Sequence, residues 1–488
     1  MADFMTLMKK SMDTSIFKKT ENGALGYASS GHALLDLNFM VSSLRNCTED
    51  EICGYFLNAF AEDANLAMKW LFYARDVRGG LGERRTFRAI YSKLPREIGV
   101  QFLKYIPEYG RYDDLIELVK CPQYKNDVID LISNQLAEDI KNMRSGNGIS
   151  LCAKWMPSIN TSSAETRALA HKIANSLRLS AKQYRKLLSR LRKYINVVET
   201  KMSANDWASI AYQTVPSRAN LKYRNAFKRH DEERFLEFLA NKGDKLKSAN
   251  LLPYEMYRAA SWDDEVNEQL WKNYPRFPTN NTLVVADGSG SMTWEWINGS
   301  GATPLDVANS LAIYFAENAQ GPYANKYITF SYRPQYVDLG EKTTLYEKKR
   351  IALQHSECSN TNIEAVFDLI LDTAVKNSLK QEELPEKIVI LSDMEFDEGR
   401  SKDLTTEVLF DTIQRKYNFY GYKMPKLVFW NICGRSNAIP MQSNENGLVL
   451  MSGFTPNQMN MLMSNKLDPY ENLVEVLNGD RYKNIELL

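Results

Sequence analysis

The sequence predicts an α-solenoid followed by a doubly wound α/β domain. Apolar residues recur at helical spacing from about residue 32 to residue 247, and no alternating strand pattern interrupts them. From residue 281 onward, short β-branched runs alternate with helical stretches, which is typical of a parallel sheet with helices on both faces. With 488 residues, 44% of them hydrophobic, the chain is long enough to bury more than one core.

Proline-rich sequence marks the boundary between the two halves. Pro253, Pro275 and Pro278 lie between the last helical pattern and the first predicted strand. We therefore expect three parts. They are an irregular lead-in over residues 1–30, a helical domain over residues 31–280 and an α/β domain over residues 281–488.

The helical half has the features of stacked helical pairs. The apolar side of a strongly basic amphipathic helix is formed by Tyr184, Leu187, Leu188, Leu191 and Ile195. Serial helices joined by short turns favour a solenoid. Because no fixed-period repeat is visible, we expect irregular HEAT-like units and not a regular array.

Six apolar runs in the second half are predicted to be strands. They are Thr282–Ala286, Lys326–Phe330, Gln335–Leu339, Lys387–Leu391, Lys426–Cys433 and Gly447–Met451. Gln335–Leu339 closely follows its predecessor, so we expect an antiparallel edge strand there. Helices are expected near Pro304–Asn318, Asn362–Lys376 and Leu404–Lys416, and as a pair within Pro456–Gly479.

The most informative segment follows the first of these strands. Asp287-Gly-Ser289-Gly-Ser291 places one carboxylate and two hydroxyls on alternate residues, at the sheet edge where α/β folds bind ligands. Three such oxygens can face one hard cation. A Gly-Ser-Gly-Ser run is also typical of a flexible linker, so the pentapeptide alone leaves both interpretations open.

Catalytic interpretations of this loop fail on chemistry. A haloacid-dehalogenase phosphatase needs a second carboxylate where Ser289 stands. A serine hydrolase needs glycines two residues before and after its serine, a condition that neither Ser289 nor Ser291 meets. A phosphate-binding P-loop needs a lysine directly before its Ser or Thr. Because neither half shows an acid, base and nucleophile set, we expect a protein that is not an enzyme.

Two later segments carry further oxygen ligands that could join those of the Asp287–Ser291 loop. Thr361 lies where a loop enters a predicted helix, and Asp393 follows a later predicted strand. An Asp-x-Ser-x-Ser sequence, a Thr and an Asp in this order are similar to the metal-ion-dependent adhesion site (MIDAS) of von Willebrand A domains. The resemblance implies a site for Mg²⁺ or Mn²⁺. We expect Asp287 to lie at an exposed strand end. Its ligands, direct or through water, would be Asp287, Ser289, Ser291, Thr361 and Asp393.

Cysteine usage and hydropathy indicate a cytoplasmic protein. Six cysteines are scattered without a C-x-x-C pair, which is typical of reduced thiols. No apolar run reaches the roughly 18 residues of a membrane-spanning helix. The first 20 residues lack the apolar core of a signal peptide.

Positive charge is unevenly distributed, although the net charge is only +1. Between Arg178 and Arg234 the chain has 14 Lys and Arg against 5 Asp and Glu, an excess that suits a phosphate-binding face. A solvated helix face would give the same pattern, and arginines near Gly79 and Gly82 can equally stabilise a helix end. The candidate RNA-binding residues are Arg75, Arg78, Arg84, Arg85, Arg185, Lys186, Arg190, Arg192, Lys193, Arg218, Lys222, Arg224, Lys228 and Arg229.

The order of the two halves resembles that of the Ro ribonucleoproteins, in which a ring of HEAT-like helices, the TROVE module, is closed by a von Willebrand A domain. Several segments are similar to an uncharacterised Ro-related family of plants, fungi and large viruses. They are Leu71–Arg84, Tyr109–Asp114, Lys154–Pro157, Trp207–Asp231 and Leu391–Asp397. The resemblance implies that the basic helical surface binds small non-coding or misfolded RNA.

Two functions therefore remain open. The first is a non-enzymatic RNA-binding scaffold with a Mg²⁺-dependent site on its A domain. The second is a protein–protein interaction module or assembly component, whose metal ion binds an acidic side chain of a partner. RNA affinity that falls steeply with salt would favour the first. Capture of a protein that EDTA abolishes would favour the second.

Overall fold

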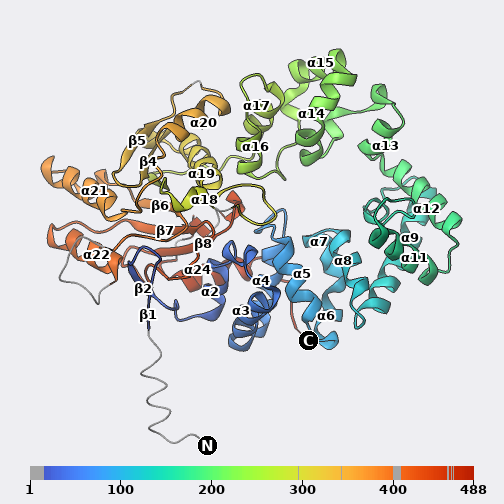
Figure 1. The fold of residues 1–488 in the computed structure, drawn as a ribbon, viewed down its shortest axis with the longest axis horizontal. Helices are drawn as coiled ribbons and strands as arrows, with labels where there is room; N and C mark the ends of the chain where they lie inside the picture. The colour runs from blue at the N-terminus through green and yellow to red at the C-terminus, as the bar shows by residue number, and fades with distance from the viewer. Residues whose placement is uncertain are drawn as a thin grey trace, which may run out of the picture. The chain divides into compact units, whose positions relative to one another are not determined.

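The computed structural model describes residues 16–294, 296–341, 343–398, 408–458, 461–462, 464 and 466–487. They form two compact units (Figure 1). We call residues 16–74, Gly79–Leu81 and Leu251–Glu486 the α/β unit, and Arg75–Arg78 with Gly82–Asn250 the helical unit. Residues 31–74 and 251–280, which the sequence analysis placed in the helical domain, thus pack in the unit that contains the sheet.

A six-stranded sheet forms the centre of the α/β unit, with the strand order β5-β4-β3-β6-β7-β8. The strands are β3 (Thr282–Asp287), β4 (Lys326–Phe330), β5 (Gln335–Asp338), β6 (Lys387–Ser392), β7 (Lys426–Asn431) and β8 (Leu448–Ser452). All six predicted strands are present. β5 pairs antiparallel with β4, which confirms the predicted edge strand, and all other pairs are parallel. β3 and β6 are adjacent, so the residues after each strand meet at one edge.

Helices cover the sheet. α19 (Pro304–Asn318) packs on β3 and β6, and almost all of its side chains are buried. It begins with a capping box between Thr303 and Asp306 and a proline at its first position, both of which favour a helix start. The remaining helices of this unit are α2 (Ala33–Phe39), α3 (Glu49–Glu62), α4 (Ala64–Arg75), α16 (Pro253–Ala259), α17 (Glu265–Lys272), α18 (Ser291–Trp294), α20 (Leu345–Gln354), α21 (Glu364–Lys376), α22 (Leu409–Phe419) and α24 (Pro469–Leu477).

Most of the helices predicted for the α/β part are present. α21 confirms the helix expected near Asn362–Lys376. α22 begins at Leu409, and residues 404–407 of the expected helix lie outside the described residues. α24 is one helix of the pair expected within Pro456–Gly479. α20 was not predicted.

A cluster of charges ties three helices of this unit together. Glu317 of α19 accepts hydrogen bonds from Trp271 Nε1 at 2.9 Å and from Arg276 Nη1 and Lys348 Nζ at 2.6 Å each. Only 10% of the Glu317 and Lys348 side chains is exposed. This carboxylate therefore pairs with the buried Lys348 and with Arg276, whose side chain is 33% exposed.

Glu317→Gln should destabilise the α/β unit. The amide keeps the size of the side chain but leaves Lys348 without a counter-charge. Breaking a buried ion pair lowers the free energy of unfolding by roughly 3–5 kcal/mol, and we expect a loss near the lower end of that range. The measurement is urea unfolding. Glu471→Gln is the control, because its pair with Lys466 is exposed and contributes at most about 1 kcal/mol. Equal midpoints for the two variants would contradict the prediction.

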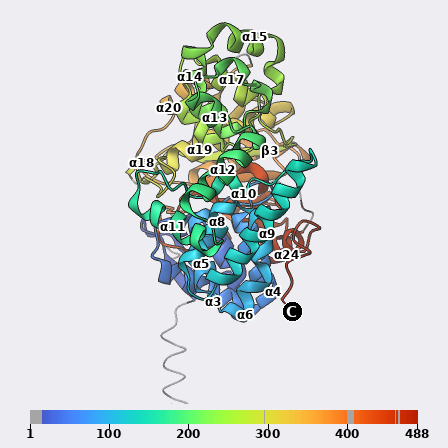
Figure 2. The same ribbon diagram turned by 90° about the vertical axis from the view of Figure 1, so that its right-hand side faces the viewer.

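The helical unit contains no strand among its described residues. In Figure 2 its helices α9, α11 and α12 face the viewer. Helix lengths range from 4 residues in α10 to 20 in α9. The helices are α5 (Arg84–Lys93), α6 (Arg96–Gly99), α7 (Ile106–Tyr109), α8 (Tyr112–Glu117), α9 (Lys125–Arg144), α10 (Cys152–Trp155), α11 (Ala164–Ser176), α12 (Ala181–Ile195), α13 (Val198–Ser203), α14 (Ser217–His230) and α15 (Glu232–Lys242).

The basic helix predicted from its periodicity is α12. A capping box between Ser180 and Gln183 starts it, and Asn196 ends it in the left-handed conformation. Of the five predicted apolar residues, Tyr184, Leu188 and Leu191 are buried, and Leu187 and Ile195 are half-buried. Elsewhere too, no helix among the described residues has both the length and the apolar character to cross a membrane.

Candidate functional site

The predicted metal ligands lie at the carboxyl edge of the sheet. Asp287 is the last residue of β3, and Asp393 directly follows the neighbouring β6. Ser289 lies in the loop between β3 and α18, Ser291 is the first residue of α18, and Thr361 precedes α21. Three loops that are distant in sequence therefore supply the set.

Hydrogen bonds fix the first loop. Asp287 Oδ1 accepts the Ser289 backbone N–H at 2.9 Å, and Asp287 Oδ2 accepts the Ser392 hydroxyl at 2.6 Å. The hydroxyl oxygens of Ser289 and Ser291 are 3.0 Å apart. Such close hydroxyls can share one cation, and the buried, bonded loop excludes the linker interpretation.

The two glycines allow the second loop to approach the first. Gly290 N–H donates to Ser359 O at 3.0 Å, and Cys358 N–H donates to Gly288 O at 2.8 Å. A Cβ atom at Gly290 would lie 3.1 Å from Cys358 O, closer than the backbone accommodates easily. The Asp-Gly-Ser-Gly-Ser spacing therefore brings the loop before Thr361 against the hydroxyls.

The carboxylates are buried, which changes their electrostatics. Asp287 is 0% exposed, so the expectation of an exposed strand end is wrong. Burial raises the pKa of Asp287, and the Asp397 carboxylate raises it further. Burial also raises the pKa of Asp393, with further contributions from Asp287 and Glu395.

This donor set fits a divalent cation. Burial and a neighbouring carboxylate raise the pKa of both Asp287 and Asp393, whereas Arg435 opposes the shift at Asp393. A divalent ion between the two carboxylates would supply further positive charge. Among the described residues no group of three or more His, Cys, Asp or Glu side chains is arranged to hold a metal, so a cation would also need the hydroxyl ligands. Asp287, Ser289, Ser291, Thr361 and Asp393 would hold it, and the ion would supply an electron-poor position for an anionic group.

Sequence reasoning missed four residues around this set. Arg435 Nη2 lies 3.3 Å from Asp393 Oδ2 and 3.0 Å from Glu21 Oε2. Glu395 is buried and accepts the backbone N–H groups of Glu21, Arg435 and Ser436. Asn22 Nδ2 donates to Thr361 Oγ1 at 3.1 Å and to Glu395 O at 2.6 Å.

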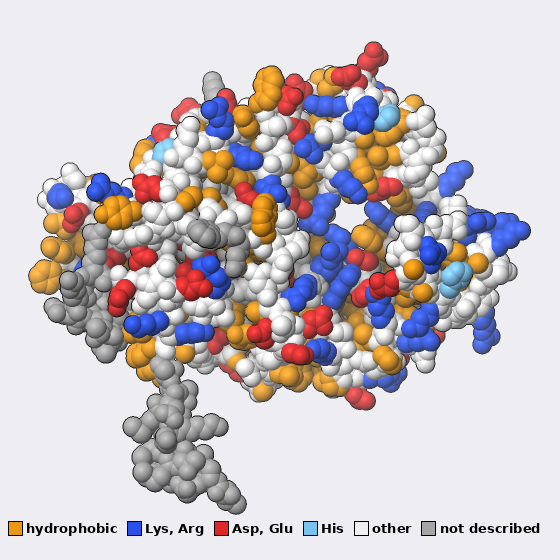
Figure 3. Space-filling view, in the orientation of Figure 1, with side chains coloured by type: hydrophobic (Ala, Val, Ile, Leu, Met, Phe, Trp, Pro, Cys, Tyr) orange, Lys and Arg blue, Asp and Glu red, His pale blue; other side chains and the backbone are white. Residues whose placement is uncertain are grey.

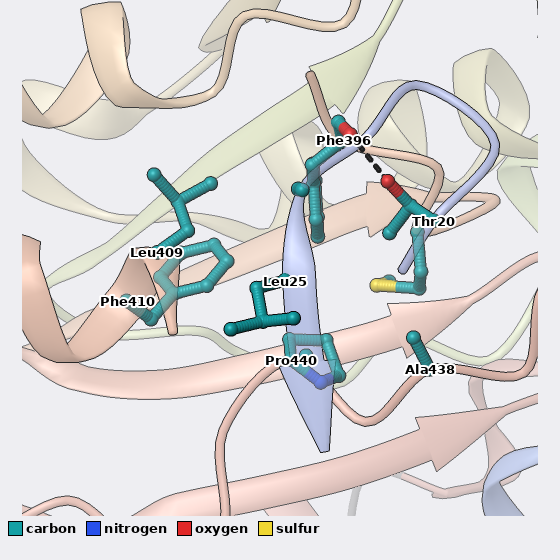
Figure 4. A pocket seen from close by; sticks show the side chains of 10 residues that line it. Thr20, Leu25, Phe396, Leu409, Phe410, Ala438 and Pro440 are labelled. Atoms are coloured by element: carbon teal, nitrogen blue, oxygen red, sulfur yellow. Dashed lines mark hydrogen bonds between the residues drawn. The ribbon is translucent and has the colours of Figure 1, made fainter. Parts of the chain in front are cut away.

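The segment that carries Glu21 and Asn22 is a β-hairpin, although an irregular lead-in was expected. β1 (Phe17–Lys19) and β2 (Leu25–Tyr27) pair antiparallel. Figure 4 shows a small pocket where Leu25 lies among Leu409, Phe410 and Pro440, and the Thr20 hydroxyl donates to Phe396 O at 2.7 Å. These contacts anchor the turn of the hairpin over Thr361.

Asn22→Ala should weaken Mg²⁺ or Mn²⁺ binding about tenfold, since groups that orient a ligand contribute roughly 10- to 100-fold to metal affinity. The Asn22 amide fixes the Thr361 hydroxyl and leaves it a free lone pair. Titration calorimetry would measure the change. Gln442→Ala is the control, because Gln442 donates to Ser29 O of the same segment at 2.7 Å without touching a metal ligand. Equal metal affinity in both variants would show that Asn22 does not position Thr361.

The structure separates the predicted RNA-binding residues into two groups. Arg75 is buried and its guanidinium is held by Asp114 at 2.6 Å. Arg192 donates to Ala153 O, Met156 O and Ser158 Oγ. Both side chains hold the fold together, which corrects their assignment to an RNA surface. Arg78 and Arg224 donate to the backbone oxygens of Glu108 and Leu221. Lys228 is half-buried. The exposed members are Arg78, Arg84, Arg85, Arg185, Lys186, Arg190, Lys193, Arg218, Lys222 and Arg229.

The exposed group includes a basic face on α12, formed by Arg185, Lys186, Arg190 and Lys193. The helix has six Lys and Arg and no Asp or Glu over its 15 residues. Figure 3 shows blue side chains gathered over α11 and α12. The structure thus brings the predicted metal ligands together and leaves the basic residues spread over the surface of the helical unit.

Comparisons with known proteins show the family to which the chain belongs. Residues 20–96 and 120–277 match a family described as a domain of unknown function (DUF2828). Residues 281–484 match a second family, also described as a domain of unknown function (DUF7788). An uncharacterised protein of Acanthamoeba polyphaga mimivirus is 30% identical over 508 residues, which cover 94% of this chain and 86% of the viral protein. The chain belongs to the family of that viral protein.

Among solved structures, the chain is similar to the Ro (RSR) protein of Deinococcus radiodurans. The TM-score is 0.36 at 13% sequence identity, over 90% of this chain and 93% of the other. At this distance the likeness carries no argument about function. The descriptions of the matching families name no activity, so we infer function from the predicted metal ligands and the basic residues.

Proposed function

We propose that the protein is a non-enzymatic, Ro-like RNA-binding scaffold. Its helical unit binds small or misfolded RNA, and its α/β unit carries a Mg²⁺-dependent site. The basic face of α12 carries this proposal. Six cations and no acid in 15 residues differ from an ordinary solvated helix face, which interleaves both signs.

The spacing of these cations has a physical cost that a polyanion would offset. Lys186 and Arg190 lie four residues apart, and Arg190 and Lys193 three apart, so like charges are neighbours on one face. Phosphates bound along this face would neutralise them and release counterions. Contacts of this kind do not read base sequence. The proposal therefore predicts affinity for RNA of many sequences.

Ultraviolet crosslinking of the full chain to a structured RNA with a single-stranded end tests the proposal. Crosslinked peptides should come from α12 and α14, and should disappear when unlabelled RNA competes. Crosslinks confined to the α/β unit would contradict the assignment of RNA to the helical unit.

The three-loop oxygen set favours a second function, the metal-dependent capture of a protein. Hydroxyl ligands in place of further carboxylates leave a bound ion electron-poor, which favours a carboxylate in its open position. A partner would then offer an Asp or Glu side chain. This function would be supported if the wild type retained a partner protein in Mg²⁺ and released it on addition of EDTA. The Ser289→Ala variant should not retain that partner.

A further inference from the structure

Two aromatic rings from different elements of the helical unit lie flat against each other at its surface. Trp207 begins the short 3-10 helix η4 (Trp207–Ser209), and His230 is the last residue of α14. Their ring centroids are 4.5 Å apart and their planes differ by 9°. Trp207 is half-buried and His230 is exposed. Because Trp207 covers one face of the imidazole, the exposed surface of that ring lies on its other face and its edges.

Packing beneath the stack holds it in place. Phe227 of α14 is fully buried, and its ring meets the Trp207 ring in a T-shaped contact at 6.5 Å. Trp207 Nε1 donates to Asn205 Oδ1 at 2.7 Å, and Trp207 O accepts a hydrogen bond from Arg234 Nη2 at 2.7 Å. The indole is therefore fixed in the free protein, and a helix end carries the imidazole. A surface that is fixed in advance loses little conformational freedom when a ligand binds to it.

The outer face of His230 is not used by the part of the chain that the structure describes. Within that part, its ring nitrogens make no hydrogen bond or ion pair, and Trp207 is the only ring that contacts it. His32 of the α/β unit differs. Its ring also stacks on an aromatic side chain, but its Nδ1 lies 2.9 Å from a carboxylate oxygen of Glu62. The stack at His230 therefore ends in an open aromatic face.

The charges around the stack favour a base over a phosphate at His230 itself. Directly after His230, α15 begins with Glu232 and Glu233, which are exposed. These carboxylates repel a phosphate, whereas an uncharged base is little affected. Lys222 and Arg229 are exposed on α14, seven residues apart, so they lie on one face about 10 Å apart along the helix axis. These two cations suit the phosphates of a strand whose base lies on the stack.

We propose that the stacked rings of Trp207 and His230 form a platform on which an unpaired base of RNA stacks. Every base has a flat π-face, and aromatic side chains, histidine among them, bind single-stranded RNA by stacking on it. The platform accepts any base, while Lys222 and Arg229 contact the backbone. It deepens the proposed function and rests on it for RNA as the ligand, whereas stacking itself can be measured with a nucleoside.

The first test follows the ring-proton NMR signals of the four histidines while adenosine is added. Adenosine has no phosphate, so its binding reports on the base alone. The His230 signal, identified by its absence in His230→Leu, should move upfield because the ring current of a stacked base shields protons above its face. His171 is an exposed histidine of α11 in the same unit, and its signal should stay in place. A His230 signal that moves no more than that of His171 would overturn the platform.

The second test compares the affinities for an unpaired RNA oligomer and for an RNA duplex by fluorescence anisotropy. His230→Leu keeps Trp207 covered but removes the flat ring. Affinity for the oligomer should therefore fall at least about fivefold, the lower end of what one stacked base contributes. His230→Phe should restore it, because the ring and not a charge makes the contact. Affinity for the duplex, whose bases are already paired, should not change. His171→Leu is the control and should bind both RNAs as the wild type does.

The two tests distinguish failure of the platform from failure of the proposed function. If the wild type bound RNA and His230→Leu bound the oligomer equally well, the platform would fail and the RNA-binding scaffold would stand. Equal weakening for oligomer and duplex, or a His230→Phe variant as weak as His230→Leu, would also overturn stacking. If adenosine moved the His230 signal but the wild type bound no RNA, the platform would stand and the proposed function would fail.

Discussion

Asp287→Asn should abolish the stabilisation that Mg²⁺ gives to the wild-type protein. A ligand present at a hundred times its Kd stabilises the folded state by about 2.7 kcal/mol. The variant keeps the size of the side chain but loses a charge that an ion would bind. The melting temperature of the wild type should therefore rise as Mg²⁺ is added, and that of the variant should stay constant.

Two further results would complete this experiment. Without metal the variant should remain folded, because it loses a buried charge that lies near another carboxylate. Asp372→Asn, an exposed carboxylate of α21, is the control and should respond to Mg²⁺ as the wild type does. Retention of the Mg²⁺ response in Asp287→Asn would show that the ion binds elsewhere.

Replacing Arg185, Lys186, Arg190 and Lys193 with Gln should flatten the salt dependence of RNA binding. Each phosphate contact contributes about −0.7 to the log–log slope on single strands, so losing four contacts should reduce the slope by about 3. Affinity should fall for all sequences alike, because phosphates carry no base identity. Fluorescence anisotropy between about 50 and 200 mM salt would measure the slope.

The matched control removes the same charge from the α/β unit. Lys18, Lys376, Lys380 and Lys423 are exposed lysines outside the helical unit, and their replacement with Gln should leave the slope unchanged. Equal slopes for the two quadruple variants would mean that net charge, and not the face of α12, sets RNA affinity.

The strands, and the meeting of the candidate ligands at one edge of the sheet, could be predicted because each depends on local sequence. β3 and β6 are buried on both faces, so they are uninterrupted apolar runs, and the polar residues after them must lie at one sheet edge. The β1–β2 hairpin could not be predicted in this way. Its strands have three residues each, too few for an alternating pattern.

The surroundings of the site depend on contacts between distant residues. Asn22 and Thr361 are 339 positions apart, and nothing in either local sequence indicates their contact. The same limit applies to charge. A count along the chain gives Arg75 and Arg185 equal weight, yet one is buried against a carboxylate and the other is exposed. Burial, which depends on tertiary packing, decides which arginines can reach a phosphate.

Binding of the purified full-length chain to a structured RNA with a free single-stranded end tests the central claim most directly. The account predicts clear binding at about 50 mM salt, and a fall in affinity on the order of fifty- to several hundredfold at about 200 mM for four to six phosphate contacts. No binding at about 50 mM salt would contradict the RNA-binding scaffold, and the metal-dependent interaction module would then be the better account.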